Sequence, residues 1–118
     1  MPICVLIDVG PKVAYKNRFW KQSMFDGVEL VRKALEESYG KADDGSLKVS
    51  MVDASLRWLM RHSLLGKGDG VIMGPSTVQY YGDNLKAMEC GEDLHENVVK
   101  AFDAAWALSK GDCPKYFR

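Results

Sequence analysis

Helical periodicity dominates the pattern of apolar and polar residues along the chain. In four segments apolar side chains recur at every third or fourth position, while charged residues fall largely outside that stripe. This spacing predicts amphipathic helices that each bury one face. The predicted helices span residues 23–39, 51–64, 77–90 and 94–109.

The predicted helices are bounded by residues that start and stop helices. A short polar side chain begins each one, followed three residues later by a carboxyl or amide side chain, which is the pattern of a capping box. These predicted N-caps are Ser23, Ser50, Ser76 and Asp93. Glycine ends a helix readily because it adopts the left-handed conformation, and glycines follow the predicted helices at Gly40, Gly66, Gly91 and Gly111.

Two apolar runs predict extended structure instead. Val71-Ile72-Met73 lies between glycines and predicts a buried strand at residues 70–73, as in a parallel sheet covered by helices. Pro2–Val9 is rich in β-branched residues and predicts a strand or an extended leader. Residues 11–20 and 40–50 show no period and are predicted to be loops.

Composition places the chain among soluble globular proteins of one domain. It has 118 residues, of which 47% are hydrophobic and 27% charged. Lys plus Arg and Asp plus Glu both total 16, so no basic excess exists to bind nucleic acid. No apolar run approaches the roughly 20 residues that a membrane span needs. Cys4, Cys90 and Cys113 fit neither a disulfide framework nor a zinc site, and reduced cysteines favour the cytoplasm.

The sequence contains no complete catalytic or metal-binding constellation. His62 and His95 have no HExxH-type spacing and are interpreted as surface histidines. Gly66–Gly70 precedes the predicted strand instead of following it, so it lacks the order of a nucleotide-binding fingerprint. We therefore predict no catalytic residues and no metal ligands.

Two segments are candidates for binding. Gly74-Pro75-Ser76-Thr77 follows the predicted strand and opens a helix, where unpaired backbone N–H groups form either an anion site or a plain helix cap. Arg118, beside two aromatic residues at the end of the chain, either binds a carboxylate or lies in a solvated tail.

Several segments, taken in order, resemble the aldo-keto reductases. Val71–Thr77 with Asn84-Leu85 is similar to the last strand and following helix of that family, and Cys113–Arg118 looks like the ending of its aflatoxin-aldehyde and succinic-semialdehyde reductase branch. Further similar segments occur in the family's order: Tyr15–Trp20, Ser55–Leu59 with His62-Ser63, and Ala101–Asp103 with Ala105-Trp106.

The resemblance implies a fold class and a division of the chain. The family is an α/β (β/α)₈ TIM barrel of about 250 residues or more, and the chain resembles its C-terminal third. We expect a helix-rich structure with one or two short strands. Residues 1–14 are an unmatched leader, with a possible strand, and residues 15–118 correspond to the family's C-terminal region, a part of its NADP-binding domain.

The resemblance also implies the binding residues. The segment after the last strand would hold the adenosine 2′-phosphate end of NADPH, and Arg118 would bind the acidic group of the substrate. Tyr80 stands where relatives carry Gln or Arg, and Pro75 where they usually carry Met, Ala or a polar residue. The implied cofactor-binding residues are Gly74, Ser76, Thr77, Gln79, Tyr80, Asp83 and Asn84.

These observations favour one function and leave two alternatives. The favoured function is a partial NADPH-dependent aldehyde reductase that is inactive alone, because the family's catalytic Asp, Tyr, Lys and His lie in a region that the chain does not match. One alternative is a non-enzymatic helical interaction module, and another is a complete small enzyme of unrelated chemistry. Expected partners are NADPH and an aldehyde substrate in the parent enzyme, and other copies of the chain through exposed apolar helix faces.

Overall fold

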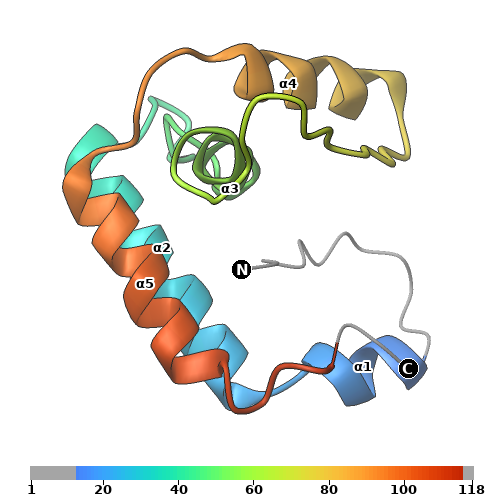
Figure 1. The fold of residues 1–118 in the computed structure, drawn as a ribbon. Coiled ribbons are helices and arrows are strands. Elements are labelled where there is room, and N and C mark those ends of the chain that lie inside the picture. The colour runs from blue at the N-terminus through green and yellow to red at the C-terminus, as the bar shows by residue number, and fades with distance from the viewer. Residues whose placement is uncertain (1–12, 116–118) are drawn as a thin grey trace.

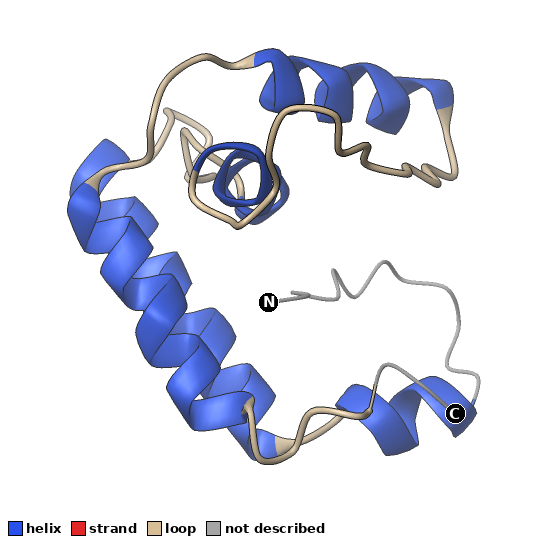
Figure 2. Ribbon diagram, in the orientation of Figure 1, coloured by secondary structure: helices blue, strands red, loops and turns tan. Residues whose placement is uncertain are grey.

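The described part of the molecule is almost entirely helical. The computed structural model describes residues 13–115, with side chains from residue 16 onward. Figure 2 shows helices joined by loops throughout this part of the chain. The five helices are α1 (Val13–Phe19), α2 (Gln22–Tyr39), α3 (Met51–Arg61), α4 (Val78–Glu89) and α5 (Glu96–Ser109). The predicted leader strand and Arg118 lie outside the described residues.

The antiparallel pair of α2 and α5 forms the centre of the fold. Figure 1 shows the two helices side by side over their length, with the N-terminus of α2 beside the C-terminus of α5. Gly27 permits their close approach, because a Cβ at this position would lie 3.2 Å from the Cβ of Ala105. Val31 and Leu35 from α2 pack with Phe102 from α5 in the hydrophobic core.

The remaining helices extend from the two ends of this pair. Helix α3 packs on the core through Trp58, whose ring centroid lies 6.0 Å from that of Phe102. Helix α4 lies against α3, and α1 precedes the opposite end of α2, so the described chain has an open C shape (Figure 1). None of the described helices is long and apolar enough to cross a membrane.

Many large apolar side chains of the described residues are exposed. Leu64 and Ile72 are fully exposed, and Val78 is 89% exposed at the start of α4. By contrast, the largest fully buried side chains are those of Phe102, Leu35, Val31 and Val98, all on α2 or α5. The apolar faces of α3, α4 and the loop between them are therefore only partly covered by the described chain.

The structure confirms the four predicted helices and corrects some of their ends. Helix α2 begins one residue early, α3 ends at Arg61, α4 spans Val78–Glu89, and α5 starts at Glu96. The predicted loop at residues 11–20 is wrong, because residues 13–19 form α1. This segment has no glycine or proline to interrupt a local helical turn.

The predicted strand at residues 70–73 is also wrong. Gly70–Met73 forms no strand, and the only β-bridge among the described residues joins Lys41 to Leu47. A strand requires a neighbouring strand to satisfy its backbone N–H and C=O groups, and the described chain offers none to this segment. Ile72, which lies in this apolar run, is therefore exposed to solvent, although the run would suit a buried strand.

One of the four predicted N-caps is confirmed. The Ser50 hydroxyl accepts a hydrogen bond from the Asp53 N–H at 3.1 Å. The other three predictions are wrong, because the helices begin elsewhere. The actual N-caps are Lys21 instead of Ser23, Thr77 instead of Ser76, and His95 instead of Asp93.

The three residues wrongly predicted to be N-caps either bind other side chains or lie just outside the helix. Ser23 lies inside α2 and donates to the Asp112 carboxylate at 2.5 Å. The Asp93 carboxylate accepts a hydrogen bond from Arg61 at 2.8 Å. Ser76 lies one residue before the true cap of α4 and is exposed. The capping motif predicted that a helix starts nearby, but it did not predict which residue occupies the cap.

Candidate cofactor-binding site

The candidate site lies where the loop after α3 enters α4. Residues 71–75 have no regular structure, and Thr77 follows with extended backbone angles as the N-cap of α4. The Thr77 Oγ1 accepts a hydrogen bond from the Tyr80 N–H at 3.1 Å. The Thr77 hydroxyl proton remains a possible donor, because capping uses only the oxygen as an acceptor.

Two backbone N–H groups at this helix end have no acceptor in the described chain. The first turn of a helix leaves its N–H groups without intrahelical partners, and the cap satisfies only that of Tyr80. Those of Val78 and Gln79 have no partner among residues 13–115. Because both residues are exposed, an external anion could accept from these donors and interact with the positive end of the helix dipole.

The implied cofactor residues lie along one run of the chain, from Gly74 to Asn84. Gln79, Tyr80 and Asp83 are exposed on the first two turns of α4, and Asn84 is half-buried beside them. Residues separated by three or four positions lie on neighbouring parts of a helix surface, so these side chains share one side of α4. Gly74 precedes them with open space around its α-carbon, since a Cβ placed there meets no atom within 4 Å.

The electrostatics of this stretch depend on the backbone. Asp83 is the only charged side chain between Gly74 and Asn84, and Tyr80 contributes no positive charge. The attraction for an anion therefore comes from hydrogen-bond donors and the helix N-terminus, while the Asp83 carboxylate opposes it. This arrangement fits hydrogen bonding to phosphate oxygens better than it fits strong charge pairing.

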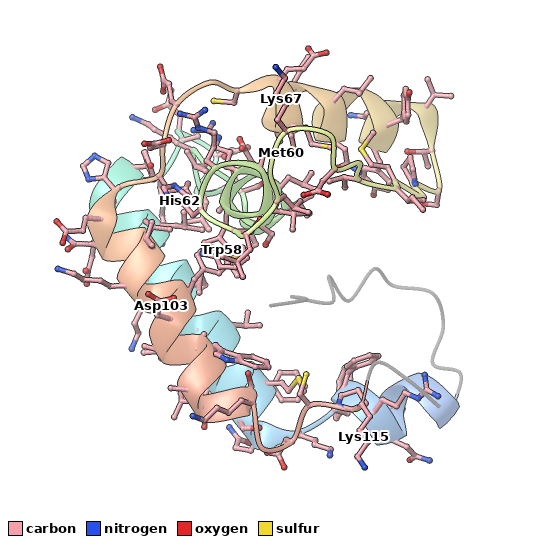
Figure 3. All side chains as sticks on the ribbon, viewed as in Figure 1. Trp58, Met60, His62, Lys67, Asp103 and Lys115 are labelled. Atoms are coloured by element: carbon pink, nitrogen blue, oxygen red, sulfur yellow. The ribbon has the colours of Figure 1, made fainter. Side chains whose placement is uncertain are left out.

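The sequence did not reveal a second group of interacting residues, at the junction of α2, α3 and α5. His62, predicted to be a surface histidine, is half-buried and its Nε2 accepts a hydrogen bond from the Leu94 N–H at 3.0 Å. Figure 3 shows His62 between α3 and the start of α5. The Tyr39 hydroxyl accepts from the His95 N–H at 2.9 Å, and the two rings meet edge to face.

No local motif could have identified these contacts. His62 and Leu94 are 32 residues apart in the sequence, and Tyr39 and His95 are 56 apart. Nearby on α3, burial acts to lower the pKa of Arg57, but the hydrogen bond to Asp53 and the electrostatic attraction of Asp53 and other neighbours together raise it. No group of described His, Cys, Asp or Glu side chains at this junction or elsewhere could hold a metal ion.

The chain is related in sequence to the aldo-keto reductases, a family of oxidoreductases, and the resemblance to the aflatoxin-aldehyde reductase branch is confirmed. It is 44% identical over 106 residues to aldo-keto reductase family 7 member A3 of Homo sapiens, covering 88% of this chain and 30% of the relative. It is 43% identical over 106 residues to aflatoxin B1 aldehyde reductase member 2 of Rattus norvegicus, covering 88% of this chain and 27% of the relative.

These matches cover most of the chain but only part of each relative. The chain spans less than a third of the length of these curated relatives. The helix-rich structure agrees with the expected C-terminal part of a (β/α)₈ barrel. No family model matches the chain.

Proposed function

We propose that the chain carries the part of an aldo-keto reductase cofactor site that holds the adenosine 2′-phosphate of NADPH. The supporting observation is the exposed N-terminus of α4, directly after the hydroxyls of Ser76 and Thr77, where the Val78 and Gln79 N–H groups have no acceptor among the described residues. The 44% identity to a member of this family includes most of the chain. A phosphate at this position gains backbone and hydroxyl hydrogen bonds together.

Each residue of the stretch has a distinct proposed role. The Ser76 and Thr77 hydroxyls and the first-turn N–H groups donate to the phosphate oxygens, and the Asn84 amide binds the same end of the cofactor. Gly74 leaves room for the cofactor to approach the backbone. Gln79 and Tyr80 border the site. At position 80, where the resemblance implies Gln or Arg in relatives, Tyr80 offers an aromatic ring and a hydroxyl and no positive charge. Asp83 limits the affinity through its negative charge.

The proposal also includes the reaction of the whole enzyme to which such a chain would belong. In the parent enzyme, NADPH supplies the hydride that reduces an aldehyde to an alcohol, and Arg118 binds the acidic group of the substrate. We expect this chain to bind only one end of the cofactor and to lack turnover. We propose a cytoplasmic location, where unpaired cysteines such as Cys90 and Cys113 ordinarily remain reduced.

Parallel titrations with NADPH and NADH test the phosphate site. We expect weak binding of both, with NADPH bound more tightly because only NADPH carries the 2′-phosphate. The double variant Ser76→Ala/Thr77→Ala should remove this difference. Since Thr77→Ala also removes a helix cap, Ser50→Ala serves as the control, because it removes the α3 cap away from the site. Equal affinities for the two nucleotides in the unmutated chain would contradict the proposal.

A further inference from the structure

The segment that joins α4 to α5 is held by side chains from other helices. Cys90 ends α4 and His95 precedes α5, and the intervening residues 91–94 have no regular structure. Three side chains that are distant in the sequence bind this segment. The contacts are Arg61 to the Asp93 carboxylate at 2.8 Å, His62 to the Leu94 N–H at 3.0 Å and Tyr39 to the His95 N–H at 2.9 Å.

Of these contacts, the one made by His62 requires an unprotonated imidazole nitrogen. An imidazole nitrogen accepts a hydrogen bond only while it is unprotonated, and histidine is the side chain that ordinarily changes charge between pH 5 and pH 8. Phenols and carboxylates ordinarily keep one protonation state over this range. Acidification in this range therefore acts on this hydrogen bond first.

We propose that His62 is a pH-sensitive clasp, which holds the segment between α4 and α5 when neutral and releases it when protonated. After protonation the Nε2–H and the Leu94 N–H are two donors facing each other, so their hydrogen bond is lost. Leu94 is only 5% exposed, and a buried N–H without an acceptor is costly. The segment must then move to expose this N–H to water.

The charged and titratable groups at this junction come from every element around it. They are Tyr39 on α2, Arg57 and Arg61 on α3, Cys90 at the end of α4, Asp93 and His95 in the joining segment, and Glu96 on α5. Arg61 pairs with Asp93, and Arg57 pairs with Asp53. None of the ion pairs among the described residues involves His62, so the proposed response rests on the hydrogen bond that Nε2 accepts.

Hydrogen exchange of the Leu94 amide, measured by NMR on the chain without nucleotide, tests the clasp. The protection factor, corrected for the intrinsic effect of pH, should be highest near pH 8 and fall toward pH 5. Its decrease should follow the titration of the His62 ring protons in the same samples. A Leu94 amide that is unprotected at pH 8, or equally protected while His62 titrates, would overturn the proposal.

Three variants separate the clasp from a merely structural effect. His62→Gln supplies an amide oxygen that accepts but does not titrate, so Leu94 should remain protected without dependence on pH. His62→Ala should leave Leu94 unprotected throughout. His95→Gln alters the chain's other histidine and should retain the pH dependence; if it abolishes that dependence, His62 is not the clasp. None of these measurements requires cofactor binding, so their outcome is independent of the proposed function.

Discussion

Arg32 lies between two carboxylates on the exposed side of α2. Its guanidinium contacts Glu29 at 2.7 Å and Glu36 at 2.8 Å, and Lys41 also contacts Glu36, at 3.0 Å. The hydrogen bond with Arg32 lowers the pKa of Glu29, while hydrogen bonds with Lys41 and then Arg32 lower the pKa of Glu36. Glu36 therefore has two cationic partners that donate to it, whereas Glu29 has one.

Substitution Arg32→Met should raise the pKa of Glu29 more than that of Glu36, because Lys41 still stabilises the Glu36 carboxylate. Carbon-13 NMR titration of the two carboxyl groups measures both values. A carboxyl with a lower pKa in the folded chain stabilises the fold above its ordinary pKa, and this contribution disappears as the pH falls through the folded value. Removing Arg32 should therefore weaken the dependence of the folding stability on acid pH. Equal changes in the pKa of Glu29 and Glu36 would contradict the prediction that Lys41 still stabilises Glu36.

At the scale of single residues, the sequence predicted hydrogen bonds between residues that are close to one another in the chain. The Ser50 cap was predictable because its partner is the Asp53 N–H, three residues away. The role of His62 was not, because its partner lies 32 residues away and is a backbone group that any residue at position 94 except proline could supply. Four of the proposed cofactor residues, Gln79, Tyr80, Asp83 and Asn84, lie on the first two turns of α4, so the helical pattern alone predicted that they are neighbours.

At the scale of elements, Gly27 determines how closely α2 and α5 pack. A glycine ordinarily weakens a helix, but here the structure places Gly27 against Ala105 of α5. Gly82 is a useful comparison, because it lies within α4 and a Cβ there meets nothing within 4 Å. Both glycines weaken their own helix, but only Gly27 also packs against another helix.

We expect Gly27→Val to destabilise the fold by about 1–3 kcal/mol, since added side-chain atoms must separate two packed helices. The matched variant Gly82→Val should change stability by less than about 0.5 kcal/mol, because open space accommodates its side chain and valine is a slightly better helix residue than glycine. Urea unfolding followed by circular dichroism measures both free energies of unfolding. Equal losses in the two variants would show that Gly27 has no special packing role.

Element types were predictable where local periodicity decides them. The four long helices have an apolar stripe, and the structure forms all four. The strand at residues 70–73 required a partner that periodicity cannot supply, and the described chain does not supply one. The short helix α1 had too few turns to establish an apolar period, and was therefore predicted to be a loop.

At the scale of the whole molecule, the incompletely covered apolar side chains predict association between copies of the chain. Ile72 is fully exposed and Val78 is 89% exposed, so burial against a second copy would remove apolar surface from water. Sedimentation velocity should show larger species as the concentration rises. The double variant Ile72→Ser/Val78→Ser should reduce them, whereas Lys86→Ser on the same helix should not. A monomer at all concentrations would contradict the prediction.

The chain alone should not reduce aldehydes. Turnover needs a positioned hydride and a proton donor for the developing alkoxide. Tyr39 lies at the junction with α5, where its hydroxyl oxygen accepts from the His95 N–H, and Tyr80 and Tyr81 are exposed on α4. NADPH consumption with succinic semialdehyde, in chain purified free of host reductases, should equal the background. Activity that disappears in Tyr80→Phe or Tyr81→Phe would show that the chain is a complete enzyme.

The pairing of α2 with α5 also sets the order in which the molecule acquires its structure. The ribosome releases α2 before α5, so the residues that cover the apolar face of α2 are synthesised only when α5 emerges. A nascent chain that stops at Cys90 contains none of Leu94, Val98 and Phe102, and therefore cannot form the core. Folding must follow translation of α5, and the intervening segment has to close as a long loop, which is slower than forming local contacts. Until then α2 is a natural target for chaperones that bind exposed apolar helices.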